Sequence, residues 1–214
     1  MDLEELEARL GPFAAAKYDD PQARVSDVHA MPGHAGFAYG FSVTSGGRTE
    51  RWFLRLPPPG VRWVGTADVL RQVAALAALA GTEVPHCEVR WSGDDLEWFG
   101  CPYFVVPRLE GDVVALTGAS WVERLPRDTR WSMARQAMTA LAGIHRVDPA
   151  LAPYLGDPVA PAEDVERWDR FVPKAAEPQR LRRVPELRAL LLDRLPRRPR
   201  IGIFHGDFQW ANLF

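Results

Sequence analysis

The last fourteen residues of the chain contain the side chains that point most directly to chemistry. His205, Asp207 and Asn212 follow an apolar run over 201–204 with the spacing H-x-D-x-x-x-x-N. A carboxylate such as that of Asp207 can accept or orient the proton of an attacking hydroxyl group, and an amide oxygen such as that of Asn212 can ligate magnesium. Both are requirements of phosphoryl transfer. His205 is expected to brace the loop by hydrogen bonds rather than to react.

The sequence around these residues predicts a strand and then a polar turn. The apolar run 201–204 is expected to form a buried strand, and apolar character resumes at Leu213 and Phe214. An alternative interpretation is a polar hairpin turn between two strands, with Gly206 and Asp207 as ordinary turn residues. The sequence of the rest of the chain is needed to distinguish a catalytic loop from a simple turn.

The loop from His205 to Asn212, with glycine directly after the histidine, resembles that of the aminoglycoside phosphotransferase and choline kinase-like family. The resemblance implies an α+β, protein-kinase-like fold of two lobes. An antiparallel five-stranded, nucleotide-binding lobe is expected over 1–108, and an incomplete, mostly helical lobe that ends in the catalytic loop over 109–214. The implied function is an ATP- and Mg²⁺-dependent kinase that phosphorylates a hydroxyl group of a small molecule.

One feature of the family is missing from this sequence. Its members continue with a further strand that brings a magnesium-binding Asp, whereas no acidic residue follows Asp207 here. The chain is therefore expected to be truncated just after the catalytic loop. The alternative to an active kinase is an inactive pseudokinase or a truncated nucleotide-binding fragment, because Asn212 alone supplies no charge to hold the metal.

The composition is that of an ordinary soluble globular protein. Of the 214 residues, 47% are hydrophobic and 25% are charged. A formal net charge of -2 gives no reason to expect nucleic acid or an anionic membrane as a partner, and no apolar stretch reaches transmembrane length. The two cysteines, Cys87 and Cys101, are expected to be reduced thiols in a cytoplasmic protein. Nothing in the sequence indicates an oligomeric state.

Apolar periodicity in the first half of the chain predicts a helix, three strands, a second helix and two further strands. Leucines and Phe13 at helical spacing indicate an amphipathic helix over 3–16, and Thr66 could cap a helix over 67–80. Short apolar runs between glycine-bearing turns indicate the strands. The predicted strands cover 25–30, 37–43, 51–56, 85–91 and 103–106.

The turn after the first predicted strand contains Gly33, His34 and Gly36. In a kinase-like fold this turn covers the nucleotide, and glycines allow backbone N–H groups to approach the phosphates. The spacing is not G-x-G-x-x-G, so a hairpin that needs glycines only for its turn remains the alternative.

Arg55 is the candidate for binding phosphates on the third predicted strand. A kinase-like fold carries a lysine there, and neither lysine of this chain, Lys17 or Lys174, lies in that strand. A guanidinium group can bind two phosphate oxygens at once, although an arginine that faces solvent is the alternative. The helix position that matches its usual acidic partner is Gln72, which can hydrogen-bond to Arg55 but cannot neutralise it.

The segment after the fifth predicted strand resembles the hinge between kinase lobes. By position, the carbonyl of Pro107 and the N–H of Leu109 would bind adenine, and proline keeps the carbonyl that this contact needs. The second half predicts helices over 131–145, 165–176 and 185–195, with Trp168 and Phe171 on the buried side of the second.

The sequence does not identify the acceptor. The resemblance allows an aminoglycoside, a macrolide, a choline-like amino alcohol, a homoserine-like amino acid or a hydroxyacyl thioester. An arginine like Arg55, in a strand that is followed by prolines as at 57–59, is a feature of one large branch of the family and slightly favours the last.

Overall fold

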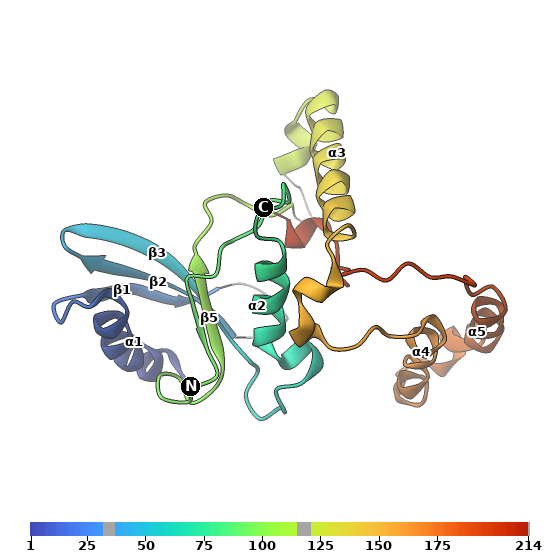
Figure 1. The fold of residues 1–214 in the computed structure, drawn as a ribbon, viewed down its shortest axis with the longest axis horizontal. Coiled ribbons are helices and arrows are strands. Elements are labelled where there is room, and N and C mark those ends of the chain that lie inside the picture. Colours follow the sequence, from blue (N-terminus) through green and yellow to red (C-terminus); the bar gives the residue numbers. More distant parts are fainter. Residues whose placement is uncertain (32–36, 115–120, 214) are drawn as a thin grey trace. The chain divides into compact units, whose positions relative to one another are not determined.

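The computed structural model describes residues 1–31, 37–114 and 121–213 (Figure 1). The chain divides into two compact units, Met1–Leu155 with Ile203–Phe214 and, separately, Gly156–Gly202. Each unit is described by itself. Among the described residues, no helix is long and apolar enough to cross a membrane.

The first unit is built on one antiparallel sheet of five strands, in the order β1-β2-β3-β5-β4. The β2–β3 hairpin pairs from Phe37 and Leu56 to Ser45 and Arg48 without a register shift, so the predicted hairpin is confirmed. Its turn residues Gly46 and Gly47 have φ values of 54° and 76°, which glycine adopts without strain. The strands are β1 (Arg24–Ala30), β2 (Phe37–Ser45), β3 (Arg48–Leu56), β4 (Trp91–Gly93) and β5 (Tyr103–Pro107).

The fourth strand is much shorter than the strand predicted over 85–91. Pairing starts where the N–H of Arg90 donates to the carbonyl of Val105, and β4 itself begins at Trp91. Pro85 has no N–H group to contribute to a ladder. Cys87 and Val89 contact the sheet and its covering helix by side-chain packing instead.

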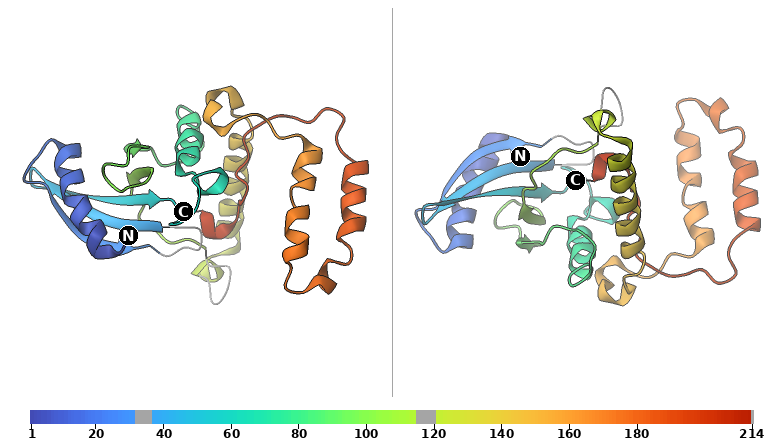
Figure 2. Two further views of the ribbon diagram at one scale, coloured as in Figure 1. Left: turned by 90° about the horizontal axis from the view of Figure 1, so that it is seen from below. Right: turned by 90° about the horizontal axis from the view of Figure 1, so that it is seen from above.

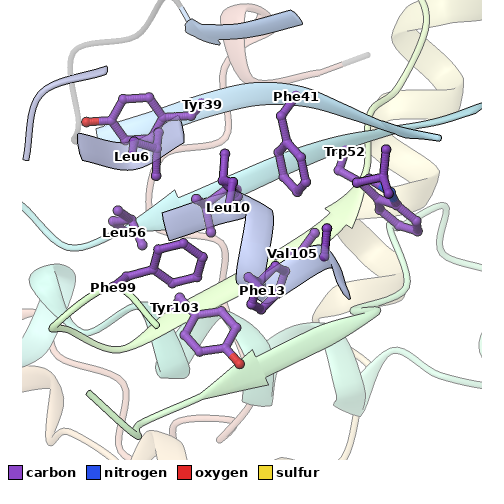
Figure 3. Close-up of a cluster of buried hydrophobic side chains, with 13 residues drawn as sticks. Leu6, Leu10, Phe13, Tyr39, Phe41, Trp52, Leu56, Phe99, Tyr103 and Val105 are labelled. Atoms are coloured by element: carbon purple, nitrogen blue, oxygen red, sulfur yellow. The ribbon is translucent and has the colours of Figure 1, made fainter. Parts of the chain in front are cut away.

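One face of the sheet is covered by α1 (Leu3–Tyr18) (Figures 1 and 3). Asp2 caps the helix by accepting a hydrogen bond from the N–H of Glu5 at 2.8 Å, and Asp19 ends it with a left-handed φ of 51°. Leu3 at the start of the predicted stripe is 44% exposed. The fully buried side chains of this core come from α1 and from the strands β2, β3 and β5: Leu6, Leu10, Phe13, Phe41, Val43, Leu54, Tyr103 and Val105.

The opposite face of the sheet is covered by α2 (Val69–Ala78), where Val69 packs with Phe104 and Val106. The predicted helix is confirmed, but its cap is not Thr66. Asp68 accepts a hydrogen bond from the N–H of Leu70 at 3.0 Å, and a 3₁₀ turn over Gly65–Ala67 precedes it. Both residue types can cap a helix, and that turn places Asp68, not Thr66, next to the first helical N–H groups.

A second buried cluster joins the end of α2 to α3 (Arg127–Ile144). Gly143 allows the close approach, because a Cβ atom at this position would lie 2.4 Å from Cγ2 of Val84. Ile203, just before the loop with the candidate catalytic residues, packs on the same cluster. The buried members are Ala78, Leu79, Val84, Val147 and Ala152.

The second unit contains α4 (Pro161–Glu166) and α5 (Val184–Asp193). The single helix predicted over 165–176 is wrong, because α4 already ends at Glu166 and a 3₁₀ turn over Asp169–Lys174 follows. Trp168 is 58% exposed, and Phe171 is exposed as well, so the expected burial is also wrong. The two rings pack on each other instead, with centroids 5.7 Å apart.

The strand predicted over 201–204 does not form. Ile201 and Phe204 are both more than half exposed, and only Ile203 packs on a core. A strand needs a neighbour for its backbone N–H and C=O groups, and none of the described residues pairs with this segment. Apolar character alone therefore did not produce a strand here.

Candidate active site

The candidate catalytic residues lie on a short loop that follows Ile203. Gly206 has a φ of 84°, a left-handed conformation that glycine adopts readily, and a 3₁₀ turn over Trp210–Asn212 follows. In Figures 1 and 2 this red turn lies beside α3. The loop therefore brings Asp207 and Asn212 onto the same turn of chain, close enough to bond to each other.

The carboxylate of Asp207 is held by two amide groups. Nε2 of Gln209 donates to both carboxylate oxygens at 3.0 Å, and Nδ2 of Asn212 donates to Oδ2 at 3.0 Å. Asn212 also donates from Nδ2 to the backbone carbonyl of Asp207 at 2.9 Å. These hydrogen bonds fix the orientation of the Asp207 carboxylate. The residue is exposed, so the carboxylate is still open to a ligand. Asn212 uses its nitrogen for these bonds, which leaves Oδ1 as the atom available to a cation.

His205 stabilises the loop from within. Its Nδ1 atom accepts a long hydrogen bond of 3.4 Å from the N–H of Asp207, and its ring packs edge to face on Phe208 with centroids 5.5 Å apart. These contacts match the bracing role expected for this residue.

Gln209 is a candidate site residue that the sequence interpretation missed. It occupies one of the unspecified positions between the aspartate and the asparagine of the motif. A side-chain amide two residues after a carboxylate in a tight turn can reach back to it, and this spacing was the available signal.

Arg55 and Gln72 lie on the α2 side of the sheet. Along β3, Leu54 and Leu56 pack against α1, so Arg55 between them points to the opposite face. Burial lowers the pKa of the Arg55 guanidinium. The ordinary pKa of arginine is so high that the group still keeps its charge at neutral pH. Gln72 is half-buried on α2, which packs on the same face. The structure thus provides a positive charge on this face with a neutral residue on the helix that covers it.

The hinge residues follow directly from β5. Pro107 ends the strand opposite Trp52, the N–H of Arg108 donates to the carbonyl of Arg51 at 2.9 Å, and Leu109 is exposed. Two ion pairs hold this segment to the sheet. Arg51 pairs with Glu110 at 3.0 Å, and Arg108 pairs with Asp27 at 3.6 Å. Exposed pairs of this kind contribute at most about 1 kcal/mol each, so they orient the segment more than they stabilise the fold.

The predicted phosphate-binding turn with Gly33, His34 and Gly36 lies outside the described residues. For magnesium, the available oxygen donors are Oδ1 of Asn212 and the carboxylate of Asp207, and no group of three His, Cys, Asp or Glu side chains that could hold a metal occurs in the described parts of the chain. Mg²⁺ commonly binds through one or two protein oxygens, with phosphates and water completing its octahedron. The donors on this loop therefore fit an ion that arrives with a nucleotide.

Comparisons with known proteins identify the family and the fold. The profile of the phosphotransferase enzyme family matches residues 36–214. A candidate aminoglycoside phosphotransferase from Ralstonia eutropha JMP134 has a similar structure, with a TM-score of 0.61 and 20% sequence identity over 89% of this chain and 54% of that one. The chain thus spans about half the length of that protein. The likeness confirms the expected α+β, protein-kinase-like fold.

Weaker likenesses connect the chain to the aminoglycoside phosphotransferase APH(4)-Ia. Its structure alone gives a TM-score of 0.38, and that of a thermostable mutant in ternary complex with AMP-PNP and hygromycin B gives 0.39. In both cases the identity is 18%, over 66% of this chain and 40% of the other. No curated protein sequence matches the chain.

Proposed function

The chain belongs to the phosphotransferase enzyme family, and from this premise we propose that it transfers the γ-phosphoryl group of ATP to a hydroxyl group of a small molecule. The observation that carries the proposal is the state of the Asp207 carboxylate. It is exposed on a loop, and the amides of Gln209 and Asn212 fix both of its oxygens. A carboxylate in a fixed orientation is what a transfer to a hydroxyl group requires.

In the proposed reaction, Asp207 accepts a hydrogen bond from the acceptor hydroxyl and takes its proton as the oxygen attacks the γ-phosphorus. The bond from that phosphorus to the bridging oxygen breaks, and ADP leaves with the electron pair. Gln209 and Asn212 keep the carboxylate directed at the hydroxyl. Magnesium, when bound with the nucleotide, supplies positive charge beside the phosphates, and Oδ1 of Asn212 would hold it.

The nucleotide would lie on the α2 side of the sheet. We assign the phosphates to Arg55, to which Gln72 would hydrogen-bond, and the adenine edge to the carbonyl of Pro107 and the N–H of Leu109. The proposal keeps 1–108 as the nucleotide-binding lobe and 109–214 as the helical lobe. It also keeps a cytoplasmic location. The turn with Gly33, His34 and Gly36 stays a prediction.

A second candidate function is nucleotide binding without transfer. It is favoured by the small set of metal donors on the loop, because among the described residues no group of three His, Cys, Asp or Glu side chains could hold a metal ion. Weak magnesium binding would lower turnover without preventing binding of the nucleotide.

The test is transfer of radiolabel from γ-labelled ATP to a panel of hydroxyl compounds: an aminoglycoside, a macrolide, an amino alcohol, a homoserine-like amino acid and a hydroxyacyl thioester. Each acceptor is matched by an analogue that lacks the hydroxyl, and each reaction is repeated with a chelator. We expect label in at least one acceptor, only with Mg²⁺ and only when the hydroxyl is present. Binding of ATP without any transfer would support the second function, and no binding of ATP would overturn both.

A further inference from the structure

β1 contains an irregularity on the side of the sheet that faces the proposed nucleotide. Its pairing with β2 shifts register between Ser26 and His29, and Asp27 has a φ of 55°. A β-bulge redirects the side chains around it. A non-glycine residue in the left-handed region is uncommon and is often associated with a functional constraint.

The bulge holds the ring of His29 in one orientation. Nδ1 of His29 lies 2.7 Å from the carbonyl oxygen of Asp27 and 3.5 Å from its Oδ1. Since a carbonyl can only accept, Nδ1 carries the proton of this bond, and in the neutral ring Nε2 is left as an acceptor. Within the described residues Nε2 makes no hydrogen bond, and the side chain is 35% exposed.

A glycine on the neighbouring strand makes room for this ring. His29 is paired with Gly40, and a Cβ atom at Gly40 would lie 2.6 Å from both Cε1 and Nε2 of His29. No other residue can occupy position 40 without moving the ring. Two separate features, the bulge on β1 and the glycine on β2, therefore place one imidazole on the surface of the sheet.

The register shows which face receives the ring. His29 pairs with Gly40, Gly40 with Phe53, and Phe53 with Val106. Residues paired across neighbouring strands share a face of the sheet. Phe53 and Val106 pack on the α2 side, so His29 points to the same side as Arg55, which is two residues beyond Phe53 on β3.

The same row of residues leads to the hinge. Val106 directly precedes Pro107, and the carboxylate of Asp27, which orients His29, also pairs with Arg108 at 3.6 Å. One acidic side chain thus links the bulge of β1 to the segment that is proposed to bind adenine. The ring of His29 lies over Gly40 of β2, on the face of the sheet that also carries Phe53 and Val106.

We propose that His29 is a specificity-determining residue that contacts the purine base of the nucleotide, by packing of its ring and by a hydrogen bond to Nε2. The assignment rests on the proposed function and deepens it, because Arg55 binds the phosphates whereas His29 recognises the base. A nucleoside triphosphate is therefore the ligand class, and its base is the part that His29 distinguishes.

The first test compares His29→Ala with His86→Ala. His86 is a matched control, because its Nδ1 lies 2.7 Å from the carbonyl of Val84 two residues earlier, as Nδ1 of His29 does to Asp27. The dissociation constants of Mg·ATP and of inorganic tripolyphosphate are measured by calorimetry. His29→Ala should raise the dissociation constant of Mg·ATP by about 5- to 50-fold, as expected when packing on the base is lost. The dissociation constant of tripolyphosphate should change by less than about twofold. His86→Ala should leave both dissociation constants unchanged.

The second test uses Gly40→Ala, which displaces the ring without removing it. This variant should weaken ATP to a similar degree in the presence of His29 and have little further effect in the His29→Ala background. Thermal melting of each variant confirms that it is folded.

The outcomes separate this inference from the proposed function. If the unsubstituted protein does not bind ATP, the proposed function fails and the role of His29 fails with it. If the protein binds ATP and His29→Ala behaves like His86→Ala, the role of His29 alone is overturned. Equal losses for ATP and tripolyphosphate would also overturn it, since the effect would then concern the phosphates.

Discussion

The α1 core and the candidate catalytic loop are held by different forces. In the core, helix and sheet bury leucine, valine and aromatic side chains that are distant in sequence, and Phe13 alone contacts four aromatic rings at 5.2 to 5.8 Å (Figure 3). In the loop, exposed polar side chains bond to partners two to five residues away. The fold and the chemistry of this chain therefore depend on separate sets of residues.

The energies differ accordingly. Burying a leucine or phenylalanine contributes about 1.5–3 kcal/mol, and removing one from a core costs more because a cavity remains. A hydrogen bond in an exposed loop contributes about 0.5–1.5 kcal/mol. Substitutions in the core should therefore change stability, and substitutions in the loop should change turnover.

The largest effect on stability is expected for Leu10→Ala. Leu10 is 0% exposed, and its removal should lower the free energy of unfolding by about 2–5 kcal/mol. Leu3→Ala on the same helix is the control, because Leu3 is exposed and should cost less than about 1 kcal/mol. Urea unfolding measures both. Equal losses would show that α1 is not fixed by the burial described here.

A smaller effect is expected in the buried cluster next to the loop. Gly143→Ala would place a Cβ atom 2.4 Å from Val84, in the cluster on which Ile203 packs before the loop. Overpacking should lower the free energy of unfolding by about 1–3 kcal/mol. Val84→Ala in the same chain should recover part of this loss, since it removes the contacting methyl groups.

Gly11→Ala provides the control for Gly143→Ala. Gly11 is also in a helix, but a Cβ atom there has nothing within 4 Å. The change should alter the free energy of unfolding by less than about 1 kcal/mol, because the higher helix propensity of alanine is offset by the contact of its Cβ with the ring of Pro12, the next residue. Stabilisation by Gly143→Ala would contradict the close contact between Gly143 and Val84.

The smallest effect is expected for Gln209→Leu. The variant keeps the size of the side chain and loses the amide that donates to Asp207. Turnover should fall about two- to tenfold, with little change in melting temperature. Gln136→Leu is the control, because its amide bonds to Ser132 within α3 and not to Asp207. A clear fall in melting temperature with unchanged turnover of the folded protein would make Gln209 a structural residue.

Features determined by local sequence could be predicted. The hairpin turn at Gly46 and Gly47 requires positive φ values, the stripe of α1 shows helical spacing, and the motif spacing places Asp207 and Asn212 on one loop. These patterns act within one element, so they can be recognised without knowing the fold.

Features determined by pairing could not be predicted. The run 201–204 is apolar enough for a strand, but the described structure gives it no partner, and the pairing of β4 begins only near Arg90. The position of His29 depends on a register shift in β1 and on its pairing with Gly40 of β2. Neither the shift nor the pairing can be read from the sequence. The contact of Gln209 with Asp207 depends on how tightly the turn closes.

The most direct test of the account is to measure turnover and the free energy of unfolding on one preparation of Asp207→Asn. The substitution keeps the shape of an exposed side chain and removes the proton acceptor. We predict that acceptor-dependent transfer falls by about 100- to 10,000-fold, while the free energy of unfolding changes by less than about 1 kcal/mol. Unchanged transfer, or a loss explained by unfolding, would contradict the separation of fold and chemistry.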